Sequence, residues 1–418
     1  MRLQSTALIY ALIYLICLLR EGQCFWPFSK KPKPGPTKPS LSPVIFVPGD
    51  GGSQMDARLN KSQVPHFLCQ KTADWFNLWL NLEELMIPLV YCWVDNIKLY
   101  YDAATRTTHN TPGVEIKIPG WGNPEVVEWI DPTHNKAGAY FKDIANLLVD
   151  LGYIRKANIH GAPYDFRKAP NENQQFFIDL KQLVEDTYEA NNRTAVTFIS
   201  HSMGSPMTLV FLQQQTLEWK RKYVRRLISL AGAWAGSMKA VKVFAMGDDL
   251  DSIVLSTKIL RVEQITNPSS AWLLPSPLFW KSSEVLVETP SHNYTMASLE
   301  KFFEAIDYKT GWEMRKDTLR YTENFSPPDV ELHCLYGDGV DTVEKLQYKK
   351  DDIAGETPKL IMGVGDGTVN QRSLRACRYW TGVSNAPINA LAVQGVDHMG
   401  ILSSSVVLDY IENIMKQP

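Results

Sequence analysis

Ala195-Val-Thr-Phe-Ile-Ser-His-Ser-Met-Gly204, centred on Ser202, is the stretch of the 418-residue chain that decides its fold. Its first half, Ala195 to Ile199, is a short apolar run of the length expected for a buried parallel strand. Pro206 to Leu212 then has the pattern of a helix with proline in its first turn. The turn between them is the G-x-S-x-G nucleophile elbow with serine in place of the first glycine. We therefore expect Ser202 to be a nucleophile, lifted clear of a sheet by a strained turn.

The backbone near this turn is predicted to form an oxyanion hole. The N–H of Met203 lies at the start of the following helix, where it can donate to a developing negative charge. Val44 to Val47 is another buried strand, and the loop Pro48-Gly-Asp-Gly-Gly52 after it can supply the second donor. Asp50 in this loop is unexpected, because an ionised carboxylate repels an oxyanion. The alternative for Asp50 is a turn-forming residue that faces solvent.

Strands and helices alternate on both sides of Ser202, which predicts an α/β-hydrolase with a doubly wound parallel sheet. Three further segments have strand character: residues 225–230, 330–336 and 390–393. Helical spacing appears at residues 138–151, 176–189, 296–306 and 403–415. The alternation is missing between about residues 237 and 328. An insertion there, after a sheet strand, is expected to form a cap over the carboxyl ends of the strands.

The chain is expected to enter the secretory route. Arg2 followed by the apolar run Ala7 to Leu19 resembles a signal peptide, and an N-terminal anchor is the alternative. The predicted organisation comprises a signal peptide (1–24), a Pro/Lys-rich leader (25–43), a first core segment (44–236) with a lid or membrane-binding insertion at about 65–100, a cap (237–328) and a second core segment (329–418).

Cysteines and sequons fit this compartment. Cleavage of the signal leaves Cys69, Cys92, Cys334 and Cys377, which allow three pairings; the sequence does not choose among them, and pairing of nearest neighbours is preferred. Glycosylation is predicted at the sequons of Asn60, Asn192, Asn293 and Asn324.

The segment Phe67 to Trp93 is unusually rich in aromatic and apolar residues and is bracketed by two cysteines. Because tryptophan prefers interfaces, we interpret it as a mobile lid or a membrane-binding module. The predicted membrane-binding residues are Trp75, Phe76, Leu78 and Trp79. The alternative is a helix pair packed wholly into the core.

A serine nucleophile needs a base, and the base needs a carboxylate that orients it. In this fold the chain order is serine, acid, histidine. His398 follows the last predicted strand and is the expected base. Asp366, in a turn flanked by glycines, is preferred as the acid over Asp338, which directly follows the strand at 330–336.

Composition predicts few other ligands. A formal net charge of −2 gives no indication of a nucleic-acid partner. Histidines and cysteines lack the spacing of a metal site. Acyl transfer through an acyl-serine needs no cofactor, so we expect none.

Several motifs give the chain a resemblance to the lecithin:cholesterol acyltransferase family, and within it to the lysosomal phospholipase A2 (group XV) branch. The resemblance runs from about Pro43 to the C-terminus. It is carried by Val47-Pro-Gly-Asp50, Leu78-Trp-Leu-Asn-Leu-Glu83, Cys92-Trp-Val-Asp-Asn96, Gly161-Ala-Pro-Tyr-Asp-Phe-Arg167, His201-Ser-Met-Gly204, Trp272-Leu-Leu-Pro275 and Asp366-Gly-Thr-Val-Asn370. The chain departs from the branch at Ala231-Gly-Ala-Trp-Ala-Gly236 and at Ser205-Pro206. Different residues at these two places can change the shape of the acyl or acceptor pocket.

The resemblance implies a specific site and activity. It implies Ser202, Asp366 and His398 as the catalytic triad, with the N–H groups of Asp50 and Met203 as the oxyanion hole. It also implies the disulfides Cys69–Cys92 and Cys334–Cys377. The implied reaction is calcium-independent deacylation of glycerophospholipids at a membrane or lipoprotein surface, with the acyl group passed to water or to a lipid alcohol such as ceramide. The implied location is the lysosome, the extracellular space or both.

Two other functions were weighed. A secreted phosphatidylcholine–sterol acyltransferase differs in its acyl acceptor, and a catalytically silent lipid-binding protein would keep the fold alone.

A further hypothesis concerns how the site works in acid. An ordinary histidine, with a pKa of about 6.5, is mostly protonated at lysosomal pH, so another group must favour activity in acid. A protonated Asp50, which donates to substrate oxygens where an ionised one repels them, is our candidate.

Overall fold

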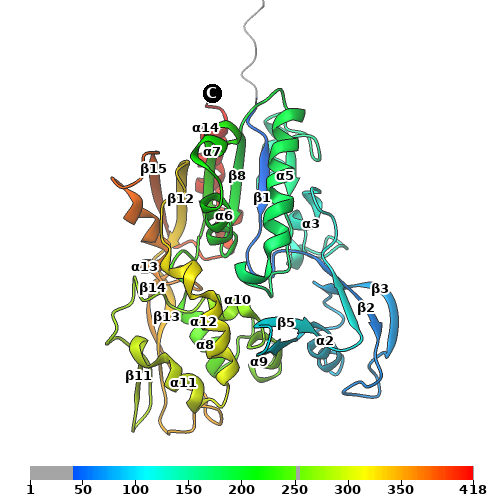
Figure 1. Ribbon diagram of the computed structural model, residues 1–418, viewed down its shortest axis with the longest axis vertical. Coiled ribbons are helices and arrows are strands. Elements are labelled where there is room, and N and C mark those ends of the chain that lie inside the picture. Colours follow the sequence, from blue (N-terminus) through cyan, green and yellow to red (C-terminus); the bar gives the residue numbers. More distant parts are fainter. Residues whose placement is uncertain (1–40, 251–254, 418) are drawn as a thin grey trace, which may run out of the picture. The chain divides into compact units, whose positions relative to one another are not determined.

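The core of the computed structural model, which describes residues 41–250 and 255–417, is a six-stranded parallel sheet (Figure 1). Its strand order is β15-β12-β9-β8-β1-β7. Strand bounds are β1 Val44–Val47, β7 Ile159–Gly161, β8 Val196–His201, β9 Val224–Leu230, β12 Glu331–Asp338 and β15 Ile388–Gln394. Every residue of β1 and β8 is buried, which explains why β1 is wholly apolar and β8 largely so, because both faces of a parallel sheet are covered. The predicted doubly wound α/β class is confirmed.

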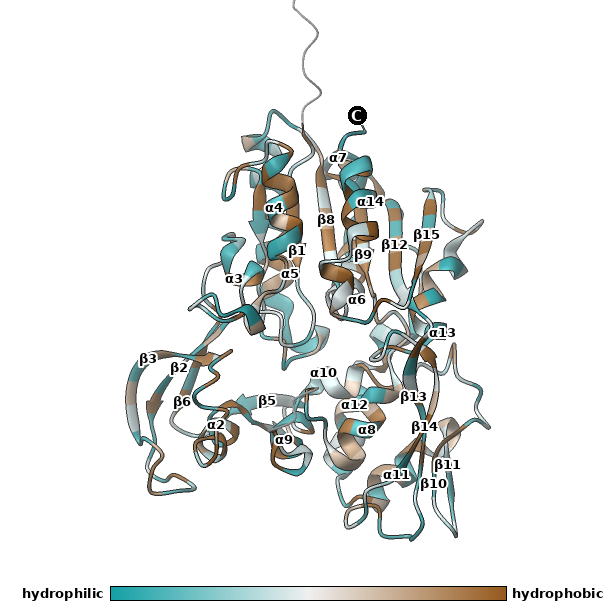
Figure 2. Ribbon diagram, turned by 180° about the vertical axis from the view of Figure 1, so that it is seen from behind, coloured by the Kyte–Doolittle hydropathy of each residue, from teal (hydrophilic) through white to brown (hydrophobic). Residues whose placement is uncertain are grey.

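Helices cover both faces of this sheet. α5 (Gln174–Ala190) and α6 (Gly204–Gln213) lie on the face seen in Figure 1, and α4 (Lys142–Asp150) and α14 (Ser405–Met415) on the face seen in Figure 2. Each buries an apolar stripe, for example Ile144 and Leu148 on α4. Short helices α3 (Glu125–Glu128), α7 (Leu217–Tyr223) and α13 (Gln371–Leu374) complete the connections. The signal peptide and most of the leader predicted for residues 1–43 lie outside the described residues.

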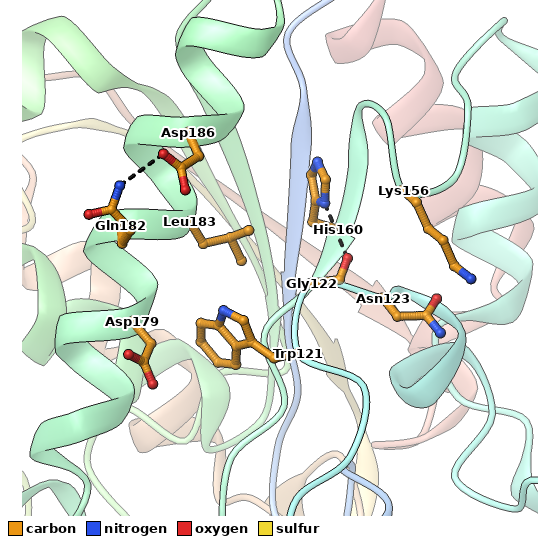
Figure 3. Close-up of a pocket in the computed structure, with 9 residues that line it drawn as sticks. All are labelled: Trp121, Gly122, Asn123, Lys156, His160, Asp179, Gln182, Leu183 and Asp186. Atoms are coloured by element: carbon orange, nitrogen blue, oxygen red, sulfur yellow. Dashed lines mark hydrogen bonds between the residues drawn. The ribbon is translucent and has the colours of Figure 1, made fainter.

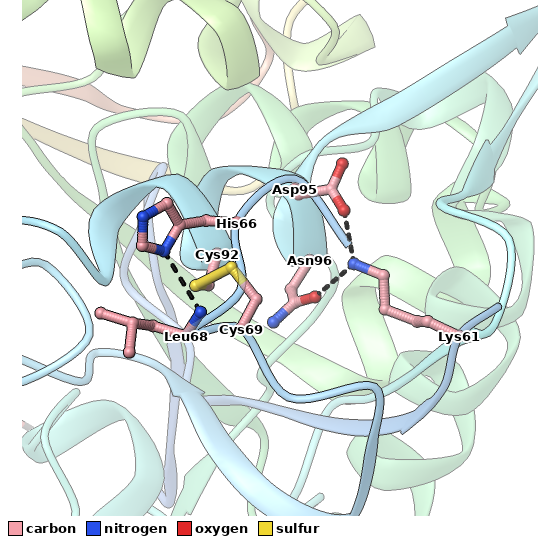
Figure 4. The surroundings of a disulfide bond; sticks show 7 residues. All are labelled: Lys61, His66, Leu68, Cys69, Cys92, Asp95 and Asn96. Carbon is pink, nitrogen blue, oxygen red and sulfur yellow. Dashed lines mark hydrogen bonds and ion pairs between the residues drawn. A yellow bond between two sulfur atoms is a disulfide. The ribbon is translucent and has the colours of Figure 1, made fainter. Parts of the chain in front are cut away.

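An antiparallel excursion follows β1. Strands β2 (Met55–Asn60), β3 (Thr72–Trp79) and β6 (Val114–Lys117) form a sheet in the order β3-β2-β6, and β4 (Leu99–Asp102) pairs with β5 (Thr107–Asn110). Helix α2 (Val90–Ile97) is tied to this excursion by the Cys69–Cys92 disulfide, whose Cα atoms are 5.3 Å apart. Beside the disulfide, Lys61 donates to Asp95 at 2.5 Å and to Asn96 at 2.8 Å (Figure 4). The segment is thus a strand, a loop and a helix rather than a helix pair.

Two of the four predicted membrane-binding residues are buried, so that prediction is wrong for Leu78 and Trp79. Both lie at the end of β3, where the strand enters the core. The Trp79 indole donates to the Gly51 carbonyl at 2.7 Å, and the Leu78 carbonyl accepts from the Trp93 indole at 3.0 Å. Composition marks this segment as aromatic, but only the strand register decides which rings face inward.

A second, smaller sheet has the order β11-β10-β13-β14. Strands β10 (Val285–Glu288) and β11 (Asn293–Thr295) come from the predicted cap, with helices α8 (Met238–Met246), α9 (Thr257–Gln264), α10 (Pro268–Trp272), α11 (Leu299–Ala305) and α12 (Lys309–Glu323). Strands β13 (Val340–Gln347) and β14 (Lys359–Gly365) follow β12 in the chain. The small sheet therefore takes strands from both sides of the boundary predicted at residue 328.

Two further contacts hold the second half of the chain together. The fully buried Arg315 guanidinium donates to the carbonyls of Ala271, Trp272 and Pro275, which fixes α12 against α10. The Cys334–Cys377 disulfide joins β12 to the 3₁₀ turn at Arg375–Trp380. None of the helices within residues 41–250 and 255–417 has the length and apolar character needed to span a bilayer.

Candidate active site

The turn between β8 and α6 holds Ser202 in a left-handed conformation. Its φ is 54°, a value that is costly for a residue with a side chain. The turn also requires Gly204, because a Cβ there would lie 2.3 Å from the Val47 carbonyl oxygen. A Cβ on Gly49 would lie 2.7 Å from the Ser202 Cβ, so the loop after β1 passes directly beside the serine. Close backbone approach thus presents the hydroxyl at the carboxyl end of the sheet.

The structure brings Ser202, His398 and Asp366 into one hydrogen-bonded line. His398 Nε2 lies 2.9 Å from Ser202 Oγ, and His398 Nδ1 lies 2.8 Å from Asp366 Oδ2. The other carboxyl oxygen of Asp366 accepts from the N–H of Val369 at 2.7 Å and of Thr368 at 3.1 Å. Asp366 is fully buried and His398 nearly so. This geometry lets an imidazole take the serine proton while a fixed carboxylate stabilises the charge that forms.

Asp338, the alternative acid, makes other contacts. Its Oδ1 accepts from the Gln371 amide at 2.6 Å and from the Gly339 N–H at 3.0 Å. The chain leaves the end of β12 at Asp338, forms the β13–β14 hairpin and returns, so that Val340 and Asp366 form a bridge. The hairpin thus places Asp366 beside the end of β12, where a carboxylate can reach the histidine loop.

The two predicted oxyanion donors flank the serine. Met203 is the N-cap of α6, and Asp50 follows Gly49 in the loop after β1. In the part of the chain that the structure describes, the N–H groups of Asp50 and Met203 donate to no protein acceptor. Two such N–H groups beside a nucleophile are what an oxyanion hole requires.

The Asp50 carboxyl has an altered pKa. The Asp50 side chain is exposed to solvent, but the protein atoms around its carboxyl group leave that group only partly hydrated. Desolvation raises its pKa to about 6; Lys239 opposes this shift and Asp248 adds to it. Asp50 therefore changes charge between lysosomal and neutral pH.

A cavity of about 650 Å³ lies beside His398 and Asp366. Its wall includes the ion pairs of Lys242 and Lys239 with Asp248, at 2.9 Å and 3.4 Å. Apolar side chains such as Met362 and Met399 also line it, so the space suits a molecule with polar and apolar parts. A second cavity of about 670 Å³ lies between α5 and β7, around Trp121 and His160 (Figure 3), away from these residues.

Two residues near Ser202 were missed by the sequence analysis. His201 lies in the predicted turn and Tyr140 in a predicted helical stretch, but neither was predicted to belong to the site. In the structure the Tyr140 hydroxyl lies 2.5 Å from His201 Nδ1, and His201 Nε2 lies 2.9 Å from the His398 carbonyl oxygen. No sequence signal marks contacts between residues so far apart in the chain.

The remaining predicted sites are distributed over the surface. Trp75 is 38% exposed, with the charged groups of Arg58 and Lys117 over its ring, and Phe76 is half-buried. All four sequon asparagines are exposed (Asn60, Asn192, Asn293 and Asn324), and their glycosylation stays a prediction. Among the described residues, no group of three or more histidine, cysteine or acidic side chains is arranged to hold a metal ion.

Comparisons with known proteins identify relatives along most of the chain. The family model for lecithin:cholesterol acyltransferase matches residues 75–405. The lysosomal phospholipase A and acyltransferase of Canis lupus familiaris is 40% identical over 377 residues, covering 90% of this chain and 92% of the relative. The human protein of the same name is 39% identical, covering 90% and 91%. The phosphatidylcholine-sterol acyltransferase of Gallus gallus is 35% identical, covering 96% and 98%.

One solved structure shares the fold at low identity. It is the chain described as "The crystal structure of Tle4-Tli4 complex", with a TM-score of 0.50 and 12% identity, covering 90% of this chain and 98% of that one.

The two candidate acids can be separated by substitution. We expect Asp366→Asn to slow labelling of Ser202 by a fluorophosphonate on the order of 10⁴-fold, because an asparagine fixes the wrong tautomer of the base. Asp338→Asn is the matched control and should label at nearly the rate of the unaltered protein. Melting temperatures would establish that both variants fold. Slow labelling of Asp338→Asn together with fast labelling of Asp366→Asn would reverse the assignment.

Proposed function

The chain belongs to the lecithin:cholesterol acyltransferase family, and from this premise we propose that it is a serine-dependent phospholipase A and acyltransferase. It removes a fatty acyl chain from glycerophospholipids and passes it to water or to a lipid alcohol such as ceramide. The observation that carries the proposal is the hydrogen-bonded line from Ser202 through His398 to Asp366. This line lies in a chain that aligns over nine-tenths of its length with relatives named lysosomal phospholipase A and acyltransferase.

The reaction proceeds in two displacements. Ser202 Oγ attacks the ester carbonyl while His398 Nε2 takes its proton, and Asp366 stabilises the imidazolium. The N–H groups of Asp50 and Met203 donate to the oxyanion. The intermediate collapses to an acyl-serine, and His398 returns the proton to the departing lysophospholipid. His398 then deprotonates water or a lipid alcohol, which attacks the acyl-serine. The bond to Ser202 Oγ breaks, His398 returns the proton to that oxygen, and the acid or the new ester is released.

The acyl acceptor separates this proposal from the sterol-directed alternative. Relatives named phosphatidylcholine-sterol acyltransferase are 34% or 35% identical to the chain, against 40% for the lysosomal relative from dog. The two disulfides and the relatives' names support a lysosomal or secreted location.

We propose that contact with a phospholipid surface involves residues in addition to the exposed Trp75. Large apolar side chains are exposed on the segments before Cys69 and before Cys92, which the disulfide joins. Phe67 is 86% exposed and Ile87 70%. We define the docking surface as Phe67, Leu68, Met86, Ile87 and Leu89. Transfer of exposed apolar groups of this kind into the interfacial region of a bilayer is favourable, because it lowers the free energy.

The proposed function is tested with the purified mature protein on phospholipid liposomes that carry ceramide and cholesterol. We expect lysophospholipid and acylceramide at about pH 4.5, with little product at about pH 7.4. Lipid products would be identified by mass spectrometry, with Ser202→Ala as the control. Cholesteryl ester at neutral pH would instead assign the protein to the sterol acyltransferases. Absence of any Ser202-dependent product would leave a lipid-binding protein.

Asp50→Asn should flatten the pH profile. The Asp50 pKa of about 6 means that the carboxyl is neutral at pH 5 and about nine-tenths ionised at pH 7. An asparagine stays neutral and can still donate, so the ratio of activity at pH 7 to that at pH 5 should rise by up to about tenfold. Asp341→Asn, which changes an exposed acid on the wall of the cavity beside His398, is the matched control. A profile identical to that of the unaltered protein would remove Asp50 as the source of acid dependence.

The docking surface is tested by the double variant Phe67→Ser/Ile87→Ser. Loss of two large apolar groups should weaken sedimentation with liposomes by about tenfold or more. Turnover of a soluble short-chain ester should be unchanged, because neither residue belongs to the strands, helices or loops that build the active site. Val383→Ser, at a position 64% exposed outside the docking surface, is the control. Equal losses in both variants would contradict the assignment.

A further inference from the structure

His201 is a buried imidazole that the serine mechanism does not use. It is the last residue of β8, directly before Ser202, and only 1% of its surface is exposed. Both ring nitrogens have partners: Nδ1 lies 2.5 Å from the Tyr140 hydroxyl and Nε2 lies 2.9 Å from the His398 carbonyl oxygen. The rings of His201 and His398 are 4.8 Å apart. A second histidine is therefore built against the base without facing the nucleophile.

The partners fix the direction of every hydrogen bond. A carbonyl oxygen only accepts, so His201 Nε2 must carry a proton and donate to His398. The Gly49 N–H donates to the Tyr140 hydroxyl oxygen at 2.9 Å, and the hydroxyl proton is then directed at His201 Nδ1. The result is one continuous line from Gly49 through Tyr140 and His201 to the His398 backbone.

The protonation states that this line needs are the favoured ones. Burial, followed by the neighbouring His398, lowers the pKa of His201 well below its usual value, which keeps the ring neutral. Burial also raises the pKa of Tyr140, so its hydroxyl keeps the proton that it donates. A neutral imidazole accepts at Nδ1 and donates at Nε2, as the geometry requires.

Each end of this hydrogen-bonded line lies in a loop that the proposed acyl transfer requires. Gly49 directly precedes Asp50, whose N–H is a proposed oxyanion donor, and the other end is the backbone of the proposed base. The Tyr140 ring also packs beneath the oxyanion loop, since a Cβ on Gly52 would lie 2.9 Å from its Cζ. The line therefore fixes the distance between the oxyanion loop and the His398 loop. It also fixes both loops relative to Ser202, which directly follows His201 at the end of β8.

We propose that Tyr140 and His201 are positioning residues that hold the oxyanion loop and the His398 loop in register around Ser202. This inference rests on the proposed function, because it assigns both residues to the same acyl transfer. Neither touches the reacting atoms; they act through Gly49 and through the His398 backbone. A displacement of about 1 Å at either loop is enough to cost on the order of 10²-fold in rate.

The test measures kcat and KM on a soluble short-chain ester, so that membrane binding does not enter. Tyr140→Phe should lower kcat by about 10- to 100-fold with KM little changed, because the lost geometry matters in the transition state. Tyr164→Phe is the matched control: its buried hydroxyl donates to the Pro48 carbonyl at 2.9 Å, in the same loop but outside the line. It should retain most of the kcat.

Two variants at His201 separate hydrogen bonding from packing. The amide of His201→Gln can still donate to the His398 carbonyl, whereas His201→Leu cannot, so the glutamine variant should retain about tenfold more kcat. Combining Tyr140→Phe with His201→Leu should cost little more than the larger single loss, because both break the same line. If Tyr140→Phe does not fold, the glutamine and leucine variants carry the test.

The measurements distinguish failure of the positioning role from failure of the proposed function. Additive losses in the double variant, equal kcat for the two His201 variants, or equal losses in Tyr140→Phe and Tyr164→Phe would each overturn the positioning role. Absence of Ser202-dependent turnover in the unaltered protein would overturn the proposed function itself.

Discussion

The close approach of backbone to backbone around Ser202 is the constraint on which the rest of the site depends. Gly204 lies so near the Val47 and Pro48 carbonyls that no side chain fits, and Gly49 passes directly beside the serine. These contacts force the positive φ of Ser202 and bring the loop after β1 beside the start of α6. A larger residue at either glycine would push the loop after β1, and with it the Asp50 N–H, away from the nucleophile. The site is therefore a property of how β1 and β8 end, rather than of the serine alone.

The position of Asp366 shows that a hairpin can be inserted between a sheet strand and the acid while the acid still reaches its histidine. Asp338 is the last residue of β12, yet the acid that contacts His398 is Asp366. Asp366 follows the β13–β14 hairpin, which belongs to the small sheet. The bridge between Val340 and Asp366 closes this excursion, and the N–H groups of Val369 and Thr368 fix the Asp366 carboxyl. The hairpin thus adds a wall to the cavity beside His398, through Val343, Leu360 and Met362, while the acid stays in reach of its base.

Most of the sheet and the three candidate catalytic residues could be predicted from the sequence, because their signals are local. Apolar runs mark β1, β8, β9, β12 and β15, the nucleophile-elbow pattern marks Ser202, and a glycine-flanked turn marks Asp366. The burial of Leu78 and Trp79 could not be predicted, since it depends on where β3 enters the core. The Tyr140–His201 contact joins residues 61 positions apart, and a bare histidine before the nucleophile gives no indication of it. The small sheet was missed for the same reason, since parallel pairing of β10 with β13 leaves no local trace.

The charges around Ser202 suit chemistry in acid. A charged His201 would stand 4.8 Å from the ring of the base and repel the imidazolium that forms there during reaction. Burial and the neighbouring His398 instead keep His201 neutral, and its hydrogen bond to the His398 carbonyl holds the loop without opposing that charge. Asp50 behaves in a complementary way, because its raised pKa removes a negative charge from beside the oxyanion donors below about pH 6. In acid both groups nearest the reacting centre are then neutral hydrogen-bonding groups, and Asp366 is left to stabilise the imidazolium. A site of this design works at low pH by limiting the fixed charges around the ester, rather than by adding a stronger base.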